Sequence, residues 1–456
     1  MAIILPRNVS YLAAIFAAWF TGNYYVPLNK EWPEAHTRKI LDHLKPDLII
    51  SDTDEYSTYC PILKPLAVDF LSEPATGLKM PAQRKLKDDD LAYIIYTSGS
   101  TGDQKGVMIY RRSLEKYISW MSQDFVTLAN CKKLLINGEL TFDISVADFA
   151  FAIAHDLEIH VTPSSSNLFA TLKMLTSRQI DSLYAVPSTL NNLCNWFSSR
   201  GGKGMEHVKH VFSGGDVLNV DLISRISKLS PDAFIYNMYG PTEATMNCLS
   251  IRVDDKLDQI IASQAVPTGR LPSHISGMLL PLNNDLPETN VGELIIAGDQ
   301  LMAGYLYDEQ KTMDAFLQVD GVSYYKTGDV FRKEGDVFHY LDRADSLVKI
   351  KGYRINLSDI TNLLCSNDDV TEARAVAVWD AKSEQYVLIA FFVLNSGVNH
   401  EDAVTSLLDL CQQNLPAYMV PSTFLPISAF PLGKTGKHDL HALRQKATAA
   451  LQKFKD

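Results

Sequence analysis

The sequence predicts an α/β protein: a large N-terminal domain of parallel sheets covered by helices plus a distorted β-barrel, and a small, mobile α+β C-terminal domain. In the first three quarters of the chain, short β-branched or aromatic runs alternate with helical stretches, which is typical of parallel strands joined by helices. Residues 292–342 hold strand-like pieces separated by turn residues, which indicates an antiparallel, distorted barrel. Near residue 345 a shorter pattern of helices and strands begins, so a domain boundary is expected there.

Each element follows from its local pattern. Expected strands are apolar runs that end at turn residues, and expected helices are longer stretches with helical spacing of apolar residues. In chain order they are strand 2–6, helix 11–20, strands 24–28, 47–52 and 91–97, helix 145–155, strands 292–298, 324–331 and 337–342, helix 358–366, strands 373–380 and 386–394, and helix 403–415. We therefore predict a large N-terminal core over residues 1–344 and a small C-terminal lid domain over residues 345–456.

Composition narrows the class of protein. With 456 residues, 46% of them hydrophobic, the chain can bury more than one core. A formal net charge of -11 disfavours nucleic acid as a partner, because nucleic-acid binding needs clustered Lys and Arg. Six single cysteines without a CxxC pair indicate neither disulfides nor zinc and fit a cytoplasmic location. The apolar run 11–20 is short and lacks a clear cleavage site, so a buried helix is favoured over a signal peptide, and no apolar run reaches the ~20 residues that span a membrane.

The sharpest chemical signal is YTSGSTGDQKG, residues 96–106, directly after an expected strand. Its glycines let the backbone approach phosphate oxygens, its hydroxyls and N–H groups donate hydrogen bonds, and Lys105 adds a positive charge. The spacing GxxxxGK[ST] is absent, so this is not the loop of P-loop NTPases. The pattern predicts a polyphosphate-binding loop, with a flexible surface loop as the alternative.

This loop resembles the signature loop of the adenylate-forming superfamily, which includes adenylation domains of nonribosomal peptide synthetases, D-alanine ligases for carrier proteins, acyl-CoA synthetases and firefly luciferase. Eight further segments resemble other motifs of that superfamily, in the same order: LPRNVSYLAAIFAAWFTGNYYVPLN, FDISV, NMYGPTEAT, GELIIAGDQLMAGYL, YKTGDV, DRADSLVKIKGYRI, LPAYMVP and PLGKTGKHDL. Together they span almost the whole chain. Family members usually carry a strand and helices before the first of these segments, so the N-terminal core is expected to lack them.

The resemblance implies a site for ATP and Mg²⁺. Tyr239 resembles the residue that stacks on adenine, Asp329 the one that accepts hydrogen bonds from the ribose hydroxyls, and Glu243 the ligand of Mg²⁺, for which a carboxylate is well suited. The other residues implied to bind the nucleotide are Thr97, Ser98, Gly99, Ser100, Thr101, Gly102, Lys105, Gly214, Gly215, Asp216, Asn237, Gly240, Thr242 and Arg343. The family more often has Glu at the position of Asp216 and Gly at the position of Asp342.

The resemblance also implies the catalytic residues Lys437, Glu243 and Thr97. Lys437 would neutralise charge as the substrate carboxylate approaches the α-phosphate, since two anions repel each other. A solvated C-terminal lysine is the alternative, because Lys434 and Lys446 are close by in the sequence. Asp345 resembles the hinge about which the C-terminal domain rotates between the two half-reactions.

Asp143 in FDISV decides the expected substrate class. In amino-acid-activating relatives an Asp at this place pairs with the substrate's α-ammonium group, and a buried carboxylate needs such a cationic partner. The alternative is that Asp143 caps the following helix, because Asp is a favoured cap. The remaining pocket residues implied by the motif offsets are Phe142, Ala147, Val211, Ser213, Met238, Met246 and Asn247. The two methionines suggest a small or medium neutral amino acid, and Asn247 could also bind a polar side chain.

The sequence therefore predicts a monomeric ligase that converts an amino acid to aminoacyl-AMP and passes it to the thiol of a phosphopantetheinylated carrier protein in trans. Neither a nucleic-acid nor a membrane partner is expected. Two alternatives remain: an acyl- or aryl-CoA ligase with the same nucleotide site, and a non-catalytic relative, which would usually have lost Lys437 or Glu243. A further alternative is that the sequence is a piece of a larger synthetase.

Overall fold

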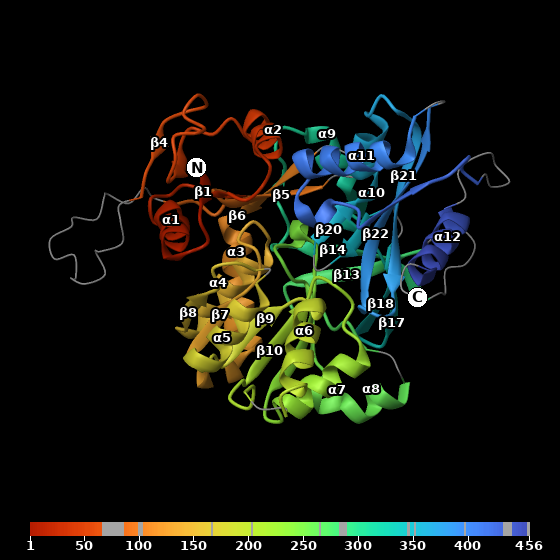
Figure 1. Ribbon diagram of the computed structural model, residues 1–456. Coiled ribbons are helices and arrows are strands. Elements are labelled where there is room, and N and C mark those ends of the chain that lie inside the picture. Colours follow the sequence, from red (N-terminus) through yellow and green to blue (C-terminus); the bar gives the residue numbers. More distant parts are fainter. Residues whose placement is uncertain are drawn as a thin grey trace. The chain divides into compact units, whose positions relative to one another are not determined.

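A computed structural model describes residues 1–65, 86–98, 104–165, 167–201, 204–263, 266–281, 290–343, 347–350, 353–395, 398–431 and 440–453 (Figure 1). The chain divides into two compact units. One is formed by Met1–Lys30, Leu44–Tyr96 and Gly106–Ala344, and the other by Glu31–His43, Thr97–Lys105 and Asp345–Asp456. The division near residue 345 was expected, whereas the two short N-terminal segments in the second unit were not; the domain roles remain predictions.

The first unit begins with a small parallel sheet. Its strands β1 (Ala2–Leu5), β2 (Val26–Asn29), β3 (Ile49–Ser51) and β4 (Ile62–Leu63) have the order β2-β1-β3-β4. Helix α1 (Val9–Phe20) follows β1. Helix α2 (Glu34–Leu44) comes after β2 in the sequence, but Glu31–His43 belongs to the second unit. Asn8 caps α1 by accepting hydrogen bonds from the backbone N–H groups of Ser10 and Tyr11. Because Leu12, Ile15 and Ala18 of α1 are buried, the apolar run 11–20 is a packed helix, as favoured from the sequence.

A larger sheet carries most of the candidate site. Its strands are β7 (Lys133–Ile136), β8 (Glu158–Val161), β9 (Ser182–Ala185), β10 (His210–Gly214), β11 (Phe234–Tyr239) and β12 (Leu249–Arg252). Their order is β12-β11-β10-β9-β7-β8, and every neighbouring pair is parallel except β11 with β12. The helices connected with this sheet are α3 (Arg111–Asp124), α4 (Ile144–His155), α5 (Leu168–Arg178), α6 (Pro187–Ser198), α7 (Val220–Leu229) and α8 (Leu257–Ser263).

Strand alternation divides this sheet into two faces. Tyr184, Phe212 and Tyr236 stand in register on the face that packs with α3 and α4. Phe212 is stacked between Phe151 of α4, at a centroid distance of 4.3 Å, and Tyr236, at 5.1 Å. Leucine, isoleucine and valine side chains from the intervening positions form a separate core with α5, α6 and α7. Both faces are therefore buried, as the predicted parallel sheet requires.

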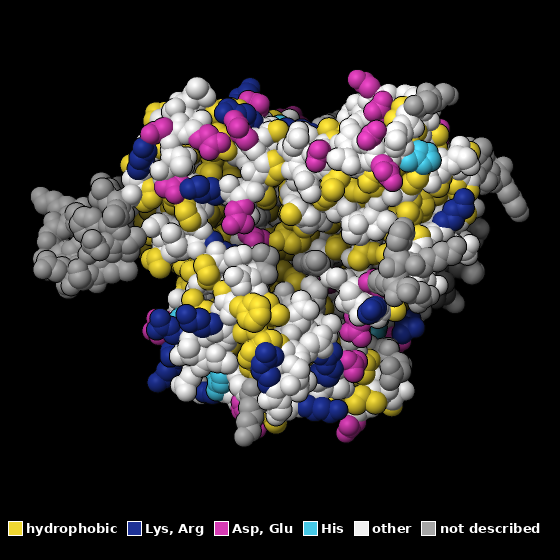
Figure 2. Space-filling model, in the orientation of Figure 1, with side chains coloured by type: hydrophobic (Ala, Val, Ile, Leu, Met, Phe, Trp, Pro, Cys, Tyr) yellow, Lys and Arg dark blue, Asp and Glu magenta, His cyan; other side chains and the backbone are white. Residues whose placement is uncertain are grey.

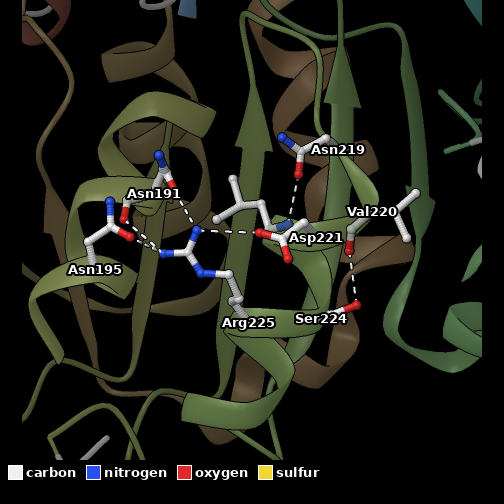
Figure 3. Close-up of polar contacts among 8 residues, drawn as sticks. Asn191, Asn195, Asn219, Val220, Asp221, Ser224 and Arg225 are labelled. Carbon is white, nitrogen blue, oxygen red and sulfur yellow. Dashed lines mark hydrogen bonds and ion pairs between the residues drawn. The ribbon is translucent and has the colours of Figure 1, made fainter. Parts of the chain in front are cut away.

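Helix α7 illustrates how local sequence and packing agree (Figure 3). Leu222, Ile223 and Ile226 recur at helical spacing and are buried. Asn219 caps the helix by accepting a hydrogen bond from the backbone N–H of Leu222 at 2.7 Å. On the polar side, the guanidinium group of Arg225 donates to the Asn191 side chain of α6 at 2.6 Å and thereby joins the two helices.

The antiparallel part of the first unit matches the predicted distorted barrel. Strands β13 (Ile275–Leu280), β14 (Val291–Gly298), β17 (Val322–Glu334) and β16 (Phe316–Val319) follow one another in that order, and β18 (Val337–Arg343) pairs with β17. Strands β5 (Leu91–Ser98), β6 (Gln104–Tyr110) and β15 (Gly304–Tyr305) form a separate sheet, in which β6 and β15 are antiparallel. The expected strand 91–97 therefore belongs to neither parallel sheet; a parallel bridge between Tyr93 and Tyr25 connects it to the residue before β2.

In the second unit, β21 (Val370–Asp380), β22 (Gln385–Leu394) and β23 (Thr423–Pro426) form a mixed sheet, and β19 (Leu347–Ile350) pairs with β20 (Tyr353–Asn356). Residues of α10 (Leu357–Cys365) and α11 (His400–Asn414) pack on one face of the mixed sheet, and α12 (Leu440–Lys453) packs on the other. The two units together confirm the predicted α/β class with a small α+β C-terminal part.

Charged side chains, helix length and cysteines each bear on the class of protein. Figure 2 shows Lys, Arg, Asp and Glu side chains interspersed with hydrophobic ones on the visible face. Within the described part of the chain, no helix combines the length and the apolar character needed to cross a membrane. The six cysteines are all free thiols, and four of them are buried.

Candidate functional site

Tyr239 and Asp329, assigned from separate motifs, lie together. Tyr239 ends β11, Asp329 lies in β17, and both are buried. The Tyr239 hydroxyl donates a hydrogen bond to Asp329 Oδ2 at 2.5 Å. The ring of Phe331 meets the ring of Tyr239 edge-on at 4.9 Å. The structure therefore brings the expected adenine and ribose contacts to one place, and the backbone of Arg343 on β18 stands opposite Asp329.

Glu243 lies in a short 3₁₀ turn, Thr242–Ala244, and is completely buried. Its Oε1 accepts a hydrogen bond from the hydroxyl of Tyr305 on β15 at 2.8 Å, and its carbonyl accepts one from the backbone N–H of Met302 at 2.8 Å. Sequence reasoning did not single out Tyr305, although it is the second-to-last residue of the matched segment GELIIAGDQLMAGYL. A hydroxyl-bearing residue in that motif was the signal that could have found it.

The turn after Glu243 is held in an unusual backbone conformation. Thr245 and Met246 have positive φ angles of 55° and 74°, which side chains with a Cβ rarely adopt. Gln300 fixes this turn: its backbone carbonyl accepts from Thr245 Oγ1 at 2.6 Å, and its amide Nε2 donates to the carbonyl of Asn247 at 2.5 Å. Gly240 is required by the close approach, since a Cβ there would lie 2.2 Å from the Met246 carbonyl oxygen. Strain of this kind is commonly found at functional sites.

Asp143 directly precedes α4 and is 6% exposed. Its side chain makes no capping hydrogen bond to α4, so the alternative role as a helix cap is not supported. Burial raises the pKa of Tyr93, Tyr117 and Tyr184, and the negative charge of Asp143 raises the pKa of each further. The negative charge of Asp143 thus acts on buried tyrosines that come from three different elements.

The pocket residues predicted by motif offset fall on two different faces of the sheet. Phe142, Ala147, Met238 and Met246 belong to the cluster on the α4 face. Val211 belongs to the core on the opposite face, and Ser213, two residues along the same strand, points to that side as well. The structure therefore does not place these two with Asp143. Tyr184, Phe212 and Gly214 lie on the α4 face. The alternation of side chains along a strand could have predicted that Phe212 and Gly214 share a face, but the sequence does not show which face packs against α4.

Both the oxygen and the nitrogen of the Asn247 side-chain amide form hydrogen bonds. The hydroxyl of Tyr117 on α3 donates to Asn247 Oδ1 at 2.8 Å, and Asn247 Nδ2 donates to the hydroxyl of Tyr184 on β9 at 3.0 Å. All three residues are buried. The expected polar role of Asn247 is thus taken up within the protein.

Asp148 was not selected from the sequence. It lies one residue after Ala147 in α4, is completely buried, and neither of its carboxylate oxygens has a hydrogen-bond partner in the described part of the structure. Burial raises the pKa of this carboxyl well above its usual range, while the positive charge of Arg7 acts in the opposite direction. Arg7 itself donates to the carbonyl groups of Ile136 and Gly138, in the segment that leads from β7 towards Asp143.

The remaining assigned residues are placed as follows. Thr97 at the end of β5 is buried, and its Oγ1 has no hydrogen-bond partner within the described ranges. Lys105 in β6 is also buried. Asn237, on β11, donates a hydrogen bond from its side-chain Nδ2 to the carbonyl of Pro267 at 2.8 Å. Asp216, partly exposed beside Gly215, accepts from the backbone N–H of Val217 at 2.8 Å. Outside the described residues lie Gly99, Ser100, Thr101, Gly102, Asp345 and Lys437, together with the side chains of Ser98 and Arg343.

Two family models match the chain: AMP-binding enzyme over residues 1–306, and AMP-binding enzyme C-terminal domain over residues 359–437. The chain therefore belongs to the AMP-binding enzymes, a family of the adenylate-forming superfamily that its motifs resemble.

Curated relatives cover nearly the whole chain. Bacitracin synthase 3 of Bacillus licheniformis is 31% identical over 99% of this chain, which spans 7% of that protein. D-alanine–D-alanyl carrier protein ligase of Lactiplantibacillus plantarum is 29% identical over 96% of this chain and 87% of that protein. The chain thus corresponds to a small part of the first relative and to most of the second.

Solved structures agree in fold. The Vibrio cholerae adenylation domain AlmE, in complex with glycyl-adenosine-5'-phosphate, matches with a TM-score of 0.79 and 22% identity over 98% of this chain and 89% of that chain. A double mutant of o-succinylbenzoate CoA synthetase from Bacillus subtilis matches with a TM-score of 0.79 and 20% identity over 97% of this chain and 87% of that chain. At these identities the likeness concerns the fold alone.

Proposed function

We propose that this chain activates the carboxylate of an amino acid with ATP, releasing pyrophosphate, and transfers the aminoacyl group from AMP to the phosphopantetheine thiol of a separate carrier protein. The observation that carries the amino-acid assignment is Asp143: a carboxylate buried beside three tyrosines that does not cap the helix it precedes. An ionised carboxylate at this position can form an ion pair with the substrate's ammonium group, the role that the resemblance implies for Asp143. The relationship to a D-alanyl carrier protein ligase supports both the amino acid and the carrier.

The nucleotide end of the site supports the ATP assignment. In the first unit, Tyr239 and Asp329 are joined by a short hydrogen bond. In the second unit, the buried Thr97 hydroxyl has no hydrogen-bond partner among the described residues, so a phosphate oxygen could accept from it. No group of three or more His, Cys, Asp or Glu side chains within the described ranges could hold a metal ion. Glu243 would therefore hold Mg²⁺ together with ATP phosphate oxygens, the binding mode that this ion prefers, and the ion would supply neutralising charge.

In the proposed first step, an oxygen of the substrate carboxylate forms a bond to the α-phosphorus of ATP while the bond to pyrophosphate breaks. Lys437 would neutralise the charge that develops between these anions. In the second step, the carrier thiolate attacks the acyl carbon and AMP leaves. Asp345 is our proposed hinge between the two steps.

The first experiment is amino-acid-dependent ATP–pyrophosphate exchange across the twenty L-amino acids, β-alanine, D-alanine and several aryl and fatty acids. One or a few amino acids should drive exchange, and Lys437→Ala should reduce it at least ~100-fold while leaving the melting temperature unchanged. Asp143→Lys should abolish exchange with the amino acid, because it places two cations together. Exchange that requires an acid without an amine, and that survives Asp143→Lys, would reassign the chain as an acyl- or aryl-CoA ligase.

The second half-reaction is tested by thioester formation on holo carrier protein, with CoA as the competing acceptor. Asp345→Pro should impair thioester formation more than pyrophosphate exchange, because a rigid residue restricts hinge rotation. Equal loss of both activities would remove the hinge assignment without affecting the adenylation assignment.

A further inference from the structure

Three large buried groups form one hydrogen-bonded chain beside Asp143. Tyr117 comes from α3, Tyr184 from β9, and Asn247 from the strained turn after Glu243, and the side-chain amide of Asn247 bonds both tyrosine hydroxyls. Tyr117 and Tyr184 have no exposed surface, and Asn247 is 4% exposed. The two bonds connect residues 130 and 63 positions apart in the sequence, so their meeting is a property of the folded pocket.

The three hydrogen-bonded side chains of Tyr117, Asn247 and Tyr184 cannot readily move aside. The backbone carbonyl of Asn247 is held by Gln300, and the ring of Tyr117 meets Trp120 edge-on at a centroid distance of 5.7 Å. The hydroxyl of Tyr184 fills the space left by Gly214, where an added Cβ would lie 2.4 Å from it. Displacing any of the three groups would leave a buried donor or acceptor without its partner, which is costly.

The same three side chains lie on the side of the sheet that packs against α4, the helix that Asp143 precedes. Tyr184 projects from the face that packs against α4, and Tyr117 belongs to the same cluster. Met238 and Met246 belong to that cluster too, and both are buried. The side chain of an amino acid whose ammonium group is bound at Asp143 would therefore meet this network and the two methionines.

We propose that the Tyr117–Asn247–Tyr184 chain is the floor of the substrate side-chain pocket and restricts the enzyme to small amino acids such as glycine, alanine and serine. This inference rests on the proposed function and adds the substrate class to it. Tyr117 is then a specificity-determining residue outside the segments that the sequence motifs identify. The selectivity would come from a fixed polar floor, because a larger side chain could enter only if the hydrogen bonds among Tyr117, Asn247 and Tyr184 were broken.

The test is pyrophosphate exchange by the full chain with glycine, alanine, serine, leucine and phenylalanine, measured as kcat/KM. The wild-type protein should prefer alanine to leucine by at least ~100-fold, since each extra methylene in a filled pocket is worth about 10-fold or more. Tyr184→Ala should reduce this ratio at least ~10-fold by opening the floor. Tyr117→Phe should reduce it about 3-fold or more, because Asn247 loses the donor that fixes its position.

Tyr25→Phe is the matched control. Tyr25 is as buried as Tyr117, but its hydroxyl has no hydrogen-bond partner in the described part of the chain, so its removal should leave the alanine-to-leucine ratio unchanged. Melting curves identify variants that fail to fold, and Tyr184→Leu replaces Tyr184→Ala in that case. An unchanged ratio in folded Tyr184 and Tyr117 variants, or wild-type preference for leucine or phenylalanine, would overturn the floor while leaving amino-acid adenylation intact. Exchange restricted to acids without an amine would overturn both proposals.

Discussion

The two faces of strands β9, β10 and β11 consist of alternating residues from the same segments, yet their chemistry differs. The face towards α5, α6 and α7 carries a hydrophobic core, and the buried Ser213 lies on the same side. The face towards α3 and α4 buries stacked aromatic rings together with Tyr117, Asn247 and Asp148, and the Asp148 carboxylate has no hydrogen-bond partner among the described residues. One side of the sheet thus carries mainly aliphatic packing, whereas the other also buries polar groups, which is costly for any group that is not hydrogen-bonded.

The largest expected effect on stability lies on the hydrophobic face. Phe197 of α6 is completely buried in that core. Phe197→Ala should lower the free energy of unfolding by about 3–5 kcal/mol, because it removes a ring and leaves a cavity. Urea denaturation measures the loss. The alanine-to-leucine ratio of the folded variant should match the wild type; a changed ratio would show that this face also shapes the pocket.

On the polar face, Asp148 should make stability depend on pH. Its pKa is raised in the folded protein, so the folded state retains this proton at pH values where the unfolded chain has lost it. The free energy of unfolding therefore falls as pH rises above about 4, by up to about 1.4 kcal/mol per pH unit, until the folded-state pKa is passed.

Asp148→Asn removes this titration. The variant should gain stability relative to the wild type between pH 4.5 and pH 7, measured as urea midpoints at half-unit intervals. Glu55→Gln, at an exposed carboxylate, is the control and should follow the wild-type curve. Parallel wild-type and Asp148→Asn curves would mean that Asp148 is charged in the folded protein, and would remove the contrast between the two faces.

The smallest effect concerns a helix end on the hydrophobic face. Asn219→Ala should lower the free energy of unfolding of the first unit by about 1 kcal/mol, because the Leu222 N–H loses its cap. Asn399 caps α11 in the second unit in the same way, by accepting from the backbone N–H of Glu401 at 2.8 Å. Asn399→Ala should affect the second unit to a similar extent without changing exchange kinetics. A larger effect of Asn219→Ala on selectivity than on stability would contradict the division between faces.

Much of the fold could be predicted because its signals are local. The alternation of apolar strands with helices and the buried helix over the apolar run 11–20 are each read within one segment, and the structure has them as expected. The expected strand 91–97 forms, but it neighbours β6, the next strand along the chain, and β6 in turn pairs with β15, which lies far away in the sequence. Sheet membership therefore could not be read from the strand's own segment.

The candidate site divides in the same way. Motif order identified Asp143, Tyr239 and Asp329, and the structure brings the last two into contact. Val211 packs in the core on the α5, α6 and α7 side of the sheet, whereas Tyr184 and Phe212 belong to the cluster on the α4 side, and the pocket roles remain predictions. A shift of one residue along a strand exchanges its faces, so the side of the sheet that a residue occupies is decided by the tertiary structure.

By itself, the sequence determined the family, the order of the elements and the residues expected to carry the chemistry, because motifs and periodicity are properties of contiguous segments. Tertiary structure alone decided which face of the sheet meets Asp143, that Tyr305 donates to Glu243, and that Tyr117, Asn247 and Tyr184 form one chain. These contacts join residues between 62 and 130 positions apart, and packing of several elements around a common core brings them together.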